Sequence, residues 1–256
     1  MLFLISPAKA LDYETPAHVD DHTQPLFVKQ AAELIDVLRQ KSPQEIAELM
    51  SLSDNLAGLN AARYEAWRPR FTAHNSKQAV LAFDGDVYGG LDARSLPAED
   101  LAWLQDHLCI LSGLYGVLRP LDRMQPYRLE MGTRLVTDKG RNLYQFWGTQ
   151  IADYLNRRAK AAHTDMVVNL ASEEYFKSVD RKALKPRVLT CAFEERKGDG
   201  YKIVSFMAKR ARGLMTRFAV QHRVSDVEQL KAFDLEGYRY SPAASDTDRF
   251  VFRRDR

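Results

Sequence analysis

Short clusters of polar side chains in this sequence have the residue types needed to bind or convert an anion. They are Ser6 with Lys9 and Asp12, the run Asp84–Tyr88, the run Gln125–Glu130, and Asn169 with Tyr175–Lys177. The clusters lie at the ends of predicted strands or in Gly-containing turns, where binding and catalytic groups often occur. A lysine beside arginine and carboxylates can hold a phosphate or carboxylate, or act as a base once it is desolvated.

Known catalytic and metal signatures are absent from the sequence. It contains no P-loop, no Gly-x-Ser-x-Gly, no His-Glu-x-x-His and no Rossmann fingerprint. His18 and His22 have i,i+4 spacing, but they lie in the polar, proline-containing run Asp12–Pro25, which is typical of a loop. We therefore predict neither a metal nor a cofactor. Cys109 and Cys191 lie in apolar surroundings without Cys-x-x-Cys spacing, so we expect reduced, buried thiols.

The stretch Tyr201–Arg223 contains six lysines and arginines and no acid, although the net charge of the chain is only +3. Within it, Ser205–Arg223 has the pattern of a helix at about 100° per residue. Its apolar face carries Met207, Ala211, Leu214, Met215 and Phe218, and its opposite face carries Lys209, Arg210, Arg212, Gly213, Thr216, Arg217 and Arg223. Clustered guanidinium groups match phosphate oxygens and bind nucleic acid by releasing counterions. The alternative is a solvated helix whose cations pair with acids elsewhere in the fold.

The segment Leu108–Pro120 is rich in glycine and apolar residues. We interpret it as a helix that ends in a turn at Ser112–Gly116, followed by a short second helix, similar to a helix-hairpin-helix DNA-binding element. Glycine amides at the start of a helix can face a phosphate. The spacing here is Gly-x-x-Gly instead of the Gly-x-Gly usual in such elements, and a plain helix end followed by a turn is the alternative.

The remaining pattern predicts the framework that positions these residues. Apolar runs predict buried strands at Leu2–Ile5, Gln78–Phe83 and Met166–Leu170, and helical spacing predicts helices at Leu26–Gln40, Leu52–Trp67, Pro97–Ile110 and Asn142–Lys160. A capping box at Ser42–Glu45 begins a further helix. A hairpin joins Arg187–Phe193 to Tyr201–Phe206, and Tyr238–Tyr240 pairs with Phe250–Phe252. Because helices and strands mix irregularly, we expect one α+β domain, residues 1–256, with a twisted sheet core surrounded by helices. No segment has the length of a membrane span.

Taken together, the motifs resemble those of the YaaA family of bacterial peroxide stress proteins along nearly the whole chain. The matching segments are Ser6–Asp12, Leu56–Arg63, Phe83–Tyr88, Leu111–Asp122, Pro126–Gly132, Leu143–Trp147, Val168–Val179 and Ala208–Met215. Ala10 departs from the pattern, since a threonine is common there. The resemblance implies a cytoplasmic protein that protects against hydrogen peroxide, partly by limiting free iron. It also implies a mixed α/β fold and a positive cleft that binds DNA, including distorted duplexes.

On this basis the first hypothesis is a monomeric protein that binds DNA through its phosphates, with selectivity for DNA shape. The predicted contacts are Ser112, Gly113, Gly116, Arg119, Arg128, Lys177, Lys209, Arg210, Arg212 and Arg217. The alternative is an enzyme that acts on a small anionic substrate in a pocket lined by Lys9, Asp12, Arg128, Glu130 and Lys177. If these five side chains converge in one cavity, chemistry is favoured; if they are dispersed over an open groove, DNA binding is favoured.

Overall fold

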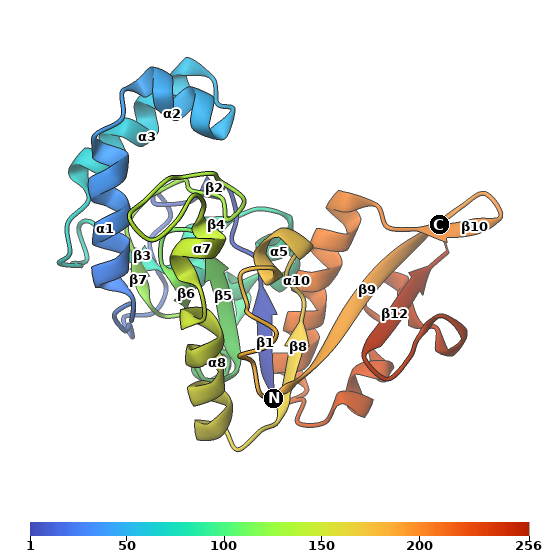
Figure 1. Cartoon of the computed structure of the whole chain (residues 1–256). Coiled ribbons are helices and arrows are strands. Elements are labelled where there is room, and N and C mark those ends of the chain that lie inside the picture. The colour runs from blue at the N-terminus through green and yellow to red at the C-terminus, as the bar shows by residue number, and fades with distance from the viewer. Residues whose placement is uncertain (256) are drawn as a thin grey trace.

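A mixed β-sheet forms the centre of the protein, whose computed structural model describes residues 1–255. In this part of the chain the main sheet has eight strands in the order β11-β12-β9-β8-β1-β5-β6, with β10 paired to β9 (Figure 1). The strands are β1 (Leu2–Ile5), β5 (Leu108–Ser112), β6 (Gly116–Leu118), β8 (Met166–Asn169), β9 (Arg187–Lys197), β10 (Gly200–Lys202), β11 (Arg239–Tyr240) and β12 (Arg249–Arg254). The predicted fold class, a mixed sheet surrounded by helices, is confirmed.

Strand β1 lies between two parallel neighbours. Leu4 is level with Cys109 of β5 on one side and with Asn169 of β8 on the other. All four residues of β1 are buried, as expected for an apolar strand covered on both faces. The chain continues from β1 to β5 on one side and later to β8 on the other. In open sheets of this kind, ligands bind where such neighbouring strands end.

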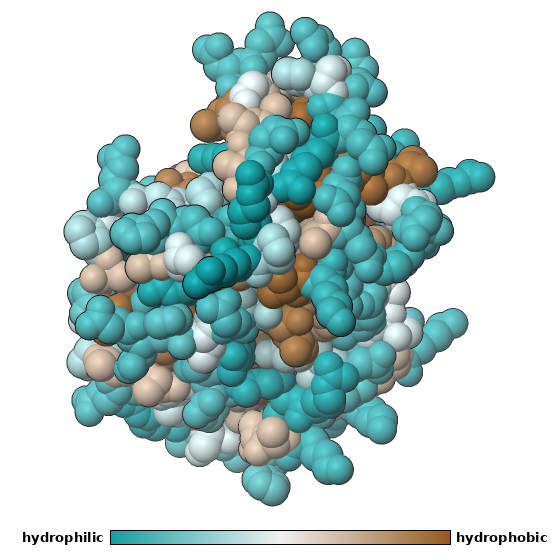
Figure 2. Space-filling view, turned by 90° about the vertical axis from the view of Figure 1, so that its left-hand side faces the viewer, coloured by the Kyte–Doolittle hydropathy of each residue, from teal (hydrophilic) through white to brown (hydrophobic). Residues whose placement is uncertain are grey.

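Helices cover both faces of the sheet, and α2 with α3 forms a hairpin that protrudes from the body (Figure 1). The helices are α1 (Val28–Arg39), α2 (Pro43–Met50), α3 (Asp54–Ala66), α4 (Ala79–Ala82), α5 (Asp86–Leu91), α6 (Ala98–His107), α7 (Leu143–Trp147), α8 (Gln150–Ala161), α9 (Glu173–Phe176) and α10 (Ser205–Gln221). Two short strand pairs complete the fold: β2 (Ala10–Leu11) with β4 (Phe83–Asp84), and β3 (Lys77–Gln78) with β7 (Arg123–Met124). Figure 2 shows the protruding hairpin above a hollow in which apolar side chains gather.

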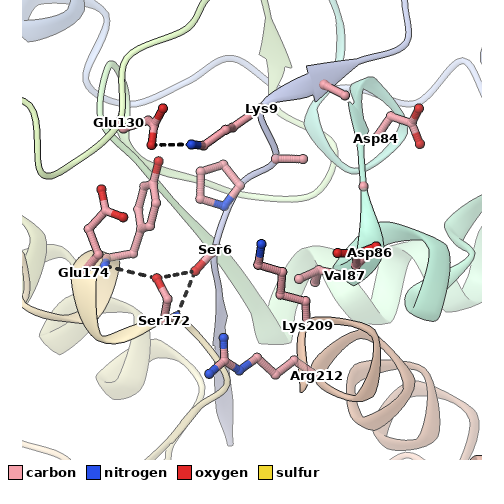
Figure 3. A pocket seen from close by; sticks show the side chains of 15 residues that line it. Ser6, Lys9, Asp84, Asp86, Val87, Glu130, Ser172, Glu174, Lys209 and Arg212 are labelled. Atoms are coloured by element: carbon pink, nitrogen blue, oxygen red, sulfur yellow. Dashed lines mark hydrogen bonds and ion pairs between the residues drawn. The ribbon is translucent and has the colours of Figure 1, made fainter. Parts of the chain in front are cut away.

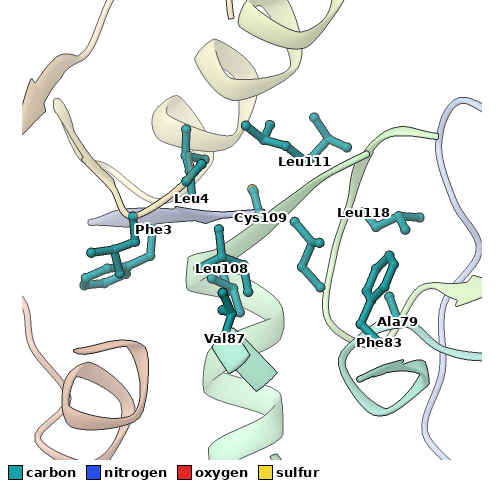
Figure 4. Packing of buried hydrophobic residues seen from close by; sticks show 14 of the residues in the cluster. Phe3, Leu4, Ala79, Phe83, Val87, Leu108, Cys109, Leu111 and Leu118 are labelled. Carbon is teal, nitrogen blue, oxygen red and sulfur yellow. The ribbon is translucent and has the colours of Figure 1, made fainter. Parts of the chain in front are cut away.

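The core brings the strands and helices together around β1 and β5 (Figure 4). Phe3, Leu4, Leu108 and Cys109 are among its buried members. Cys109 and Cys191 are free and buried, as predicted. Burial raises the pKa of each thiol to about 12, so both remain protonated at neutral pH.

Helices α5 and α10 approach one another closely at two glycines. A Cβ atom on Gly213 would lie 1.8 Å from the carbonyl oxygen of Val87, and one on Gly90 would lie 2.2 Å from that of Arg210. Each helix therefore presents its backbone directly to the other, which fixes their spacing. Gly213 and Thr216 are buried, so their predicted place on the solvent face of the helix is wrong.

The predicted helix-hairpin-helix-like element at Leu108–Pro120 is also wrong. Helix α6 ends at His107, and the segment forms the antiparallel strands β5 and β6. Its residues are apolar on both sides, so they are buried in the sheet beside β1, where a two-sided apolar strand fits. A helical hairpin does occur at α2 and α3, joined at Ser51 in the left-handed region with φ 52°.

Two other predicted elements are divided in the structure. Gln78–Phe83 contains the end of β3, the single turn α4 and the start of β4 instead of one strand. Asn142–Lys160 is split at Gly148, where φ is 49°, into α7 and α8. The capping box at Ser42 and the antiparallel pair β11–β12 are confirmed. Within residues 1–255, no helix combines the length and the hydropathy needed to cross a bilayer.

Candidate functional site

A cavity of about 430 Å³ opens at the carboxyl ends of β1 and β8 (Figure 3). We call it the edge pocket. Its walls come from the loop after β1, from β4 and the start of α5, from the loop that follows β7, from α9 and from α10. Its lining residues are Ser6, Pro7, Ala8, Lys9, Ala10, Asp84, Gly85, Asp86, Val87, Glu130, Ser172, Glu174, Tyr175, Lys209 and Arg212.

Two serines join the loops that follow β1 and β8. The backbone N–H of Ser172 donates to Ser6 Oγ at 2.9 Å, and Ser6 Oγ donates to Ser172 Oγ at 3.3 Å. Ser172 Oγ also accepts from the backbone N–H of Tyr175 and so caps α9, as predicted from the sequence. Burial raises the pKa of Tyr175 well above its ordinary value, so its phenol stays protonated. These contacts tie the two loops together at one wall of the edge pocket.

Glu130 organises two cations at a second wall. Lys9 Nζ lies 2.8 Å from its Oε2, and an Arg128 guanidinium nitrogen lies 3.3 Å from its Oε1. Because both carboxylate oxygens are engaged, Glu130 holds the two cations in position. The Lys9 side chain is 62% exposed, so its ion pair contributes little to stability. The Arg128 Nε is buried without an acceptor in residues 1–255.

Three of the five cations predicted on the basic helix face are held by the rest of the fold: two lie on α10, and Arg223 follows its end. Arg210 pairs with Glu236 at 2.5 Å, and Arg223 pairs with Asp100 at 2.6 Å. Arg217 donates to the carbonyl oxygens at the end of α5 and to Ser95 Oγ. These three residues follow the alternative stated above, in which the cations of the basic helix pair with groups elsewhere in the fold.

The remaining two cations, Lys209 and Arg212, line the edge pocket and point into it (Figure 3). Neither side chain has a hydrogen-bond or ion-pair partner in the described part of the chain. The Arg212 Nε is buried without an acceptor among residues 1–255, and burial lowers the pKa of its guanidinium. This charge is therefore desolvated and uncompensated, which is costly unless an anion binds to it.

Two residues predicted for the small-substrate pocket lie outside the lining of the edge pocket. Asp12 accepts from the backbone N–H groups of Glu14 and Thr15 and pairs with Arg94. It anchors its own loop, and Lys77 Nζ reinforces this by donating to the carbonyl oxygen of Asp12 at 2.8 Å. Lys177 lies with its Nζ 5.1 Å from the centre of the Tyr144 ring. Of the five predicted residues, Lys9 and Glu130 thus line the cavity and Arg128 supports Glu130.

Several predicted DNA contacts are also placed by the structure. Ser112, Gly113 and Gly116 are buried, and Ser112 Oγ bonds to the Tyr127 hydroxyl at 2.7 Å. Because the segment forms β5 and β6, the backbone N–H groups of these residues do not form a helix N-terminus that could bind a phosphate. Arg119 pairs with Asp122 at 3.1 Å at the far end of β6.

The edge pocket combines cations and carboxylates, which the sequence did not indicate as one site. Asp84 and Asp86 come from one side, Glu130 and Glu174 from the other, and Lys209 and Arg212 lie between them (Figure 3). The only indication of this site in the sequence was that several of its residues directly follow short apolar strands, where binding groups often lie. Among residues 1–255 no three or more His, Cys, Asp and Glu side chains form a group that could hold a metal ion. The arrangement can bind an anion and hold it in a fixed orientation.

Residues 1–244 match the family described as peroxide stress protein YaaA. A UPF0246 protein of Polaromonas naphthalenivorans (strain CJ2) is 72% identical over 254 residues, which are 99% of this chain and 98% of the relative. UPF0246 proteins of Albidiferax ferrireducens and Bordetella pertussis are 68% and 64% identical, over 99% of this chain and 98% and 99% of their own.

Proposed function

The chain belongs to the YaaA family of peroxide stress proteins, and we propose that it serves this defence by binding DNA through phosphates held at Lys209 and Arg212. The observation that carries the proposal is the pair of cations directed into the edge pocket, neither of which has a partner among the residues that the structure describes. A phosphate supplies both the charge and the acceptors that Arg212 lacks. The protein acts in the cytoplasm as a monomer in this proposal.

The shape of the site favours distorted DNA over a regular duplex. The two cations lie inside a concave pocket, and Asp84, Asp86 and Glu174 around it would repel the evenly spaced phosphates of a straight duplex. A phosphate beside a bulge or an unpaired nucleotide can enter more deeply. Selectivity would then follow DNA deformability instead of base sequence. Lys177 and Arg210 are exposed and extend this surface in the proposal.

Binding of this kind also offers a link to iron. Phosphate oxygens attract cations, and a protein that occupies them with lysine and arginine releases the counterions. We propose that DNA covered by the protein holds less iron at its distorted sites and so suffers less damage from peroxide.

The test is a fluorescence anisotropy titration of a labelled duplex with a single-nucleotide bulge and of the matching regular duplex. Replacing Lys209→Gln together with Arg212→Gln should lower affinity for the bulged duplex roughly tenfold or more, since hydrogen bonds to charged groups contribute about 1.5–3 kcal/mol each. The control is Arg157→Gln with Lys160→Gln, an exposed pair on α8 with the same i,i+3 spacing and the same charge change. Equal losses in both double variants would show that only net charge matters and would refute the site.

A second candidate function is an enzyme that acts on a small anion in the same cavity. The observation in its favour is the convergence of Lys9 and Glu130, supported by Arg128, in a cavity of about 430 Å³, a size typical of small-molecule sites. Under this alternative, DNA affinity would be weak and unselective, while a small phosphate ester would bind and be converted. Product analysis by mass spectrometry with purified protein separates the two.

A further inference from the structure

The edge pocket contains unpaired charges of both signs. Lys209 and Arg212 have no partner in the described part of the chain, and the carboxylates of Asp84 and Asp86 have no hydrogen bond or ion pair there either. The carboxylate of Asp86 attracts the guanidinium of Arg210 electrostatically without a direct ion pair, and that guanidinium is already paired with Glu236. Charges of opposite sign line one small cavity without neutralising one another.

The backbone keeps these two groups apart. Asp86 is the first residue of α5, and the close packing at Gly90 and Gly213 fixes α5 against α10, which carries both cations. Asp84 is held in β4 by its pairing with Ala10 of β2. In this arrangement neither carboxylate forms an ion pair with Lys209 or Arg212 in the described part of the chain, so a molecule that binds between them can contact both groups.

The surroundings define what such a molecule looks like. A bare anion is attracted by the cations but repelled by the carboxylates, whereas a molecule with a donor group at its other end gains from both. Pro7, Ala8 and Val87 give the cavity apolar surface between the charged groups. The protonated phenol of Tyr175 adds a hydroxyl to the same lining.

We propose that the edge pocket takes a phosphate ester with two unlike ends: the phosphate lies against Lys209 and Arg212, and an amine-bearing end donates to Asp84 and Asp86. This inference rests on the proposed phosphate site and adds the recognition of the second end. The same chemistry occurs in a free nucleotide with an exocyclic amine and in one such nucleotide extruded from a distorted duplex. Carboxylates accept well from the amine of cytosine, which uracil replaces with a carbonyl oxygen.

The experiment compares cytidine 5′-monophosphate with uridine 5′-monophosphate by isothermal titration calorimetry, since the two share their phosphate and ribose. A parallel arm compares duplexes with a bulged cytosine or uracil nucleotide. In at least one arm the cytosine ligand should bind about tenfold or more tightly than its uracil counterpart, as expected for hydrogen bonds to a charged acceptor. The arm that shows the preference identifies the source of the ligand.

The variants assign the preference to residues. Asp84→Asn with Asp86→Asn should reduce the cytosine preference to less than about twofold, because an amide accepts an amine hydrogen bond more weakly than a carboxylate. The control Asp20→Asn with Asp21→Asn, in an exposed loop, should leave it unchanged. Lys209→Gln with Arg212→Gln should weaken both ligands together.

Equal affinity for cytosine and uracil ligands in both arms overturns the two-ended ligand. The proposed phosphate site survives that result if affinity still depends on Lys209 and Arg212. A cytosine preference that is insensitive to the Asp84 and Asp86 changes also overturns the inference. If no ligand in either arm binds, or if the Lys209 and Arg212 changes have no effect, the phosphate site itself is wrong.

Discussion

Arg212→Met should make the protein more stable in the absence of anions. The guanidinium of Arg212 is desolvated, and its buried Nε has no acceptor in residues 1–255. An unsatisfied buried donor costs about 1–3 kcal/mol, and more when it is charged. Methionine keeps most of the aliphatic length of arginine and loses the uncompensated charge. We expect a gain of about 1–2 kcal/mol, or roughly 2–8 °C in Tm for a chain of this size.

The same variant should lose its response to phosphate. An anion that binds only the folded protein stabilises it by about 2.7 kcal/mol at a hundred times its dissociation constant. In urea unfolding without phosphate, the variant should therefore be more stable than the native protein. With saturating phosphate, the native protein should be the more stable of the two.

Arg158→Met is the matched control. Its Nε is also buried without an acceptor in the described part of the chain, but its guanidinium donates to the carbonyl oxygens of Gln105 and Asp106 at 3.0 and 2.6 Å. Removing it leaves two carbonyl groups without these donors, so this variant should be destabilised by roughly 1–3 kcal/mol. If Arg212→Met were destabilised like Arg158→Met and still responded to phosphate, the assignment of Arg212 as an anion-binding residue would be refuted.

Three further predictions concern the framework of the site. Gly213→Ala should lower the free energy of unfolding by at least about 3 kcal/mol, because the added Cβ would lie 1.8 Å from a carbonyl oxygen of α5. Gly58→Ala in α3 should raise it by about 0.5–1 kcal/mol, because the added Cβ would have no atom within 4 Å. Similar effects of the two changes would contradict the close helix contact. His107 stacks on the Trp103 ring with the ring centres 4.0 Å apart, and burial lowers the pKa of its imidazole, so the protein should lose stability as pH falls below about 6.5. Urea unfolding of His107→Gln should therefore show a smaller loss of stability between pH 7 and 5. An unchanged pH profile would show that this histidine is not involved. Glu236→Gln removes the carboxylate that pairs with Arg210, so it frees a cation beside Lys209 and Arg212, and phosphate affinity measured by calorimetry should rise severalfold. Glu228→Gln, which changes a surface carboxylate, should have no effect. An unchanged or lower affinity in Glu236→Gln would show that Arg210 does not contribute to the phosphate surface.

The position of the basic helix could be predicted from the sequence, but the availability of its charges could not. The apolar stripe placed a helix at Ser205–Arg223, and α10 spans Ser205–Gln221. Which cations remain unpaired depends on Glu236 and Asp100, which lie far from them in the chain and reach them only through the fold. Charge count alone therefore overestimated the basic surface.

The segment Leu108–Ser112 shows a second limit. A short apolar run followed by a glycine turn is compatible with the end of a buried helix or with a buried strand, and periodicity does not distinguish them. Pairing with β1 on one side and β6 on the other decides for a strand. The edge pocket was hidden for a related reason, because its walls come from segments far apart in the chain that only the parallel pairing of β1 with β8 and the packing of α5 against α10 bring together.

The most direct measurement is a crystal structure of the protein grown with cytidine 5′-monophosphate. We expect the phosphate to lie within hydrogen-bond distance of Lys209 and Arg212 in the edge pocket, with the cytosine amine directed toward Asp84 and Asp86. A phosphate bound elsewhere, with the side chain of Arg212 still without an acceptor, would contradict the assignment of this pocket as the phosphate site.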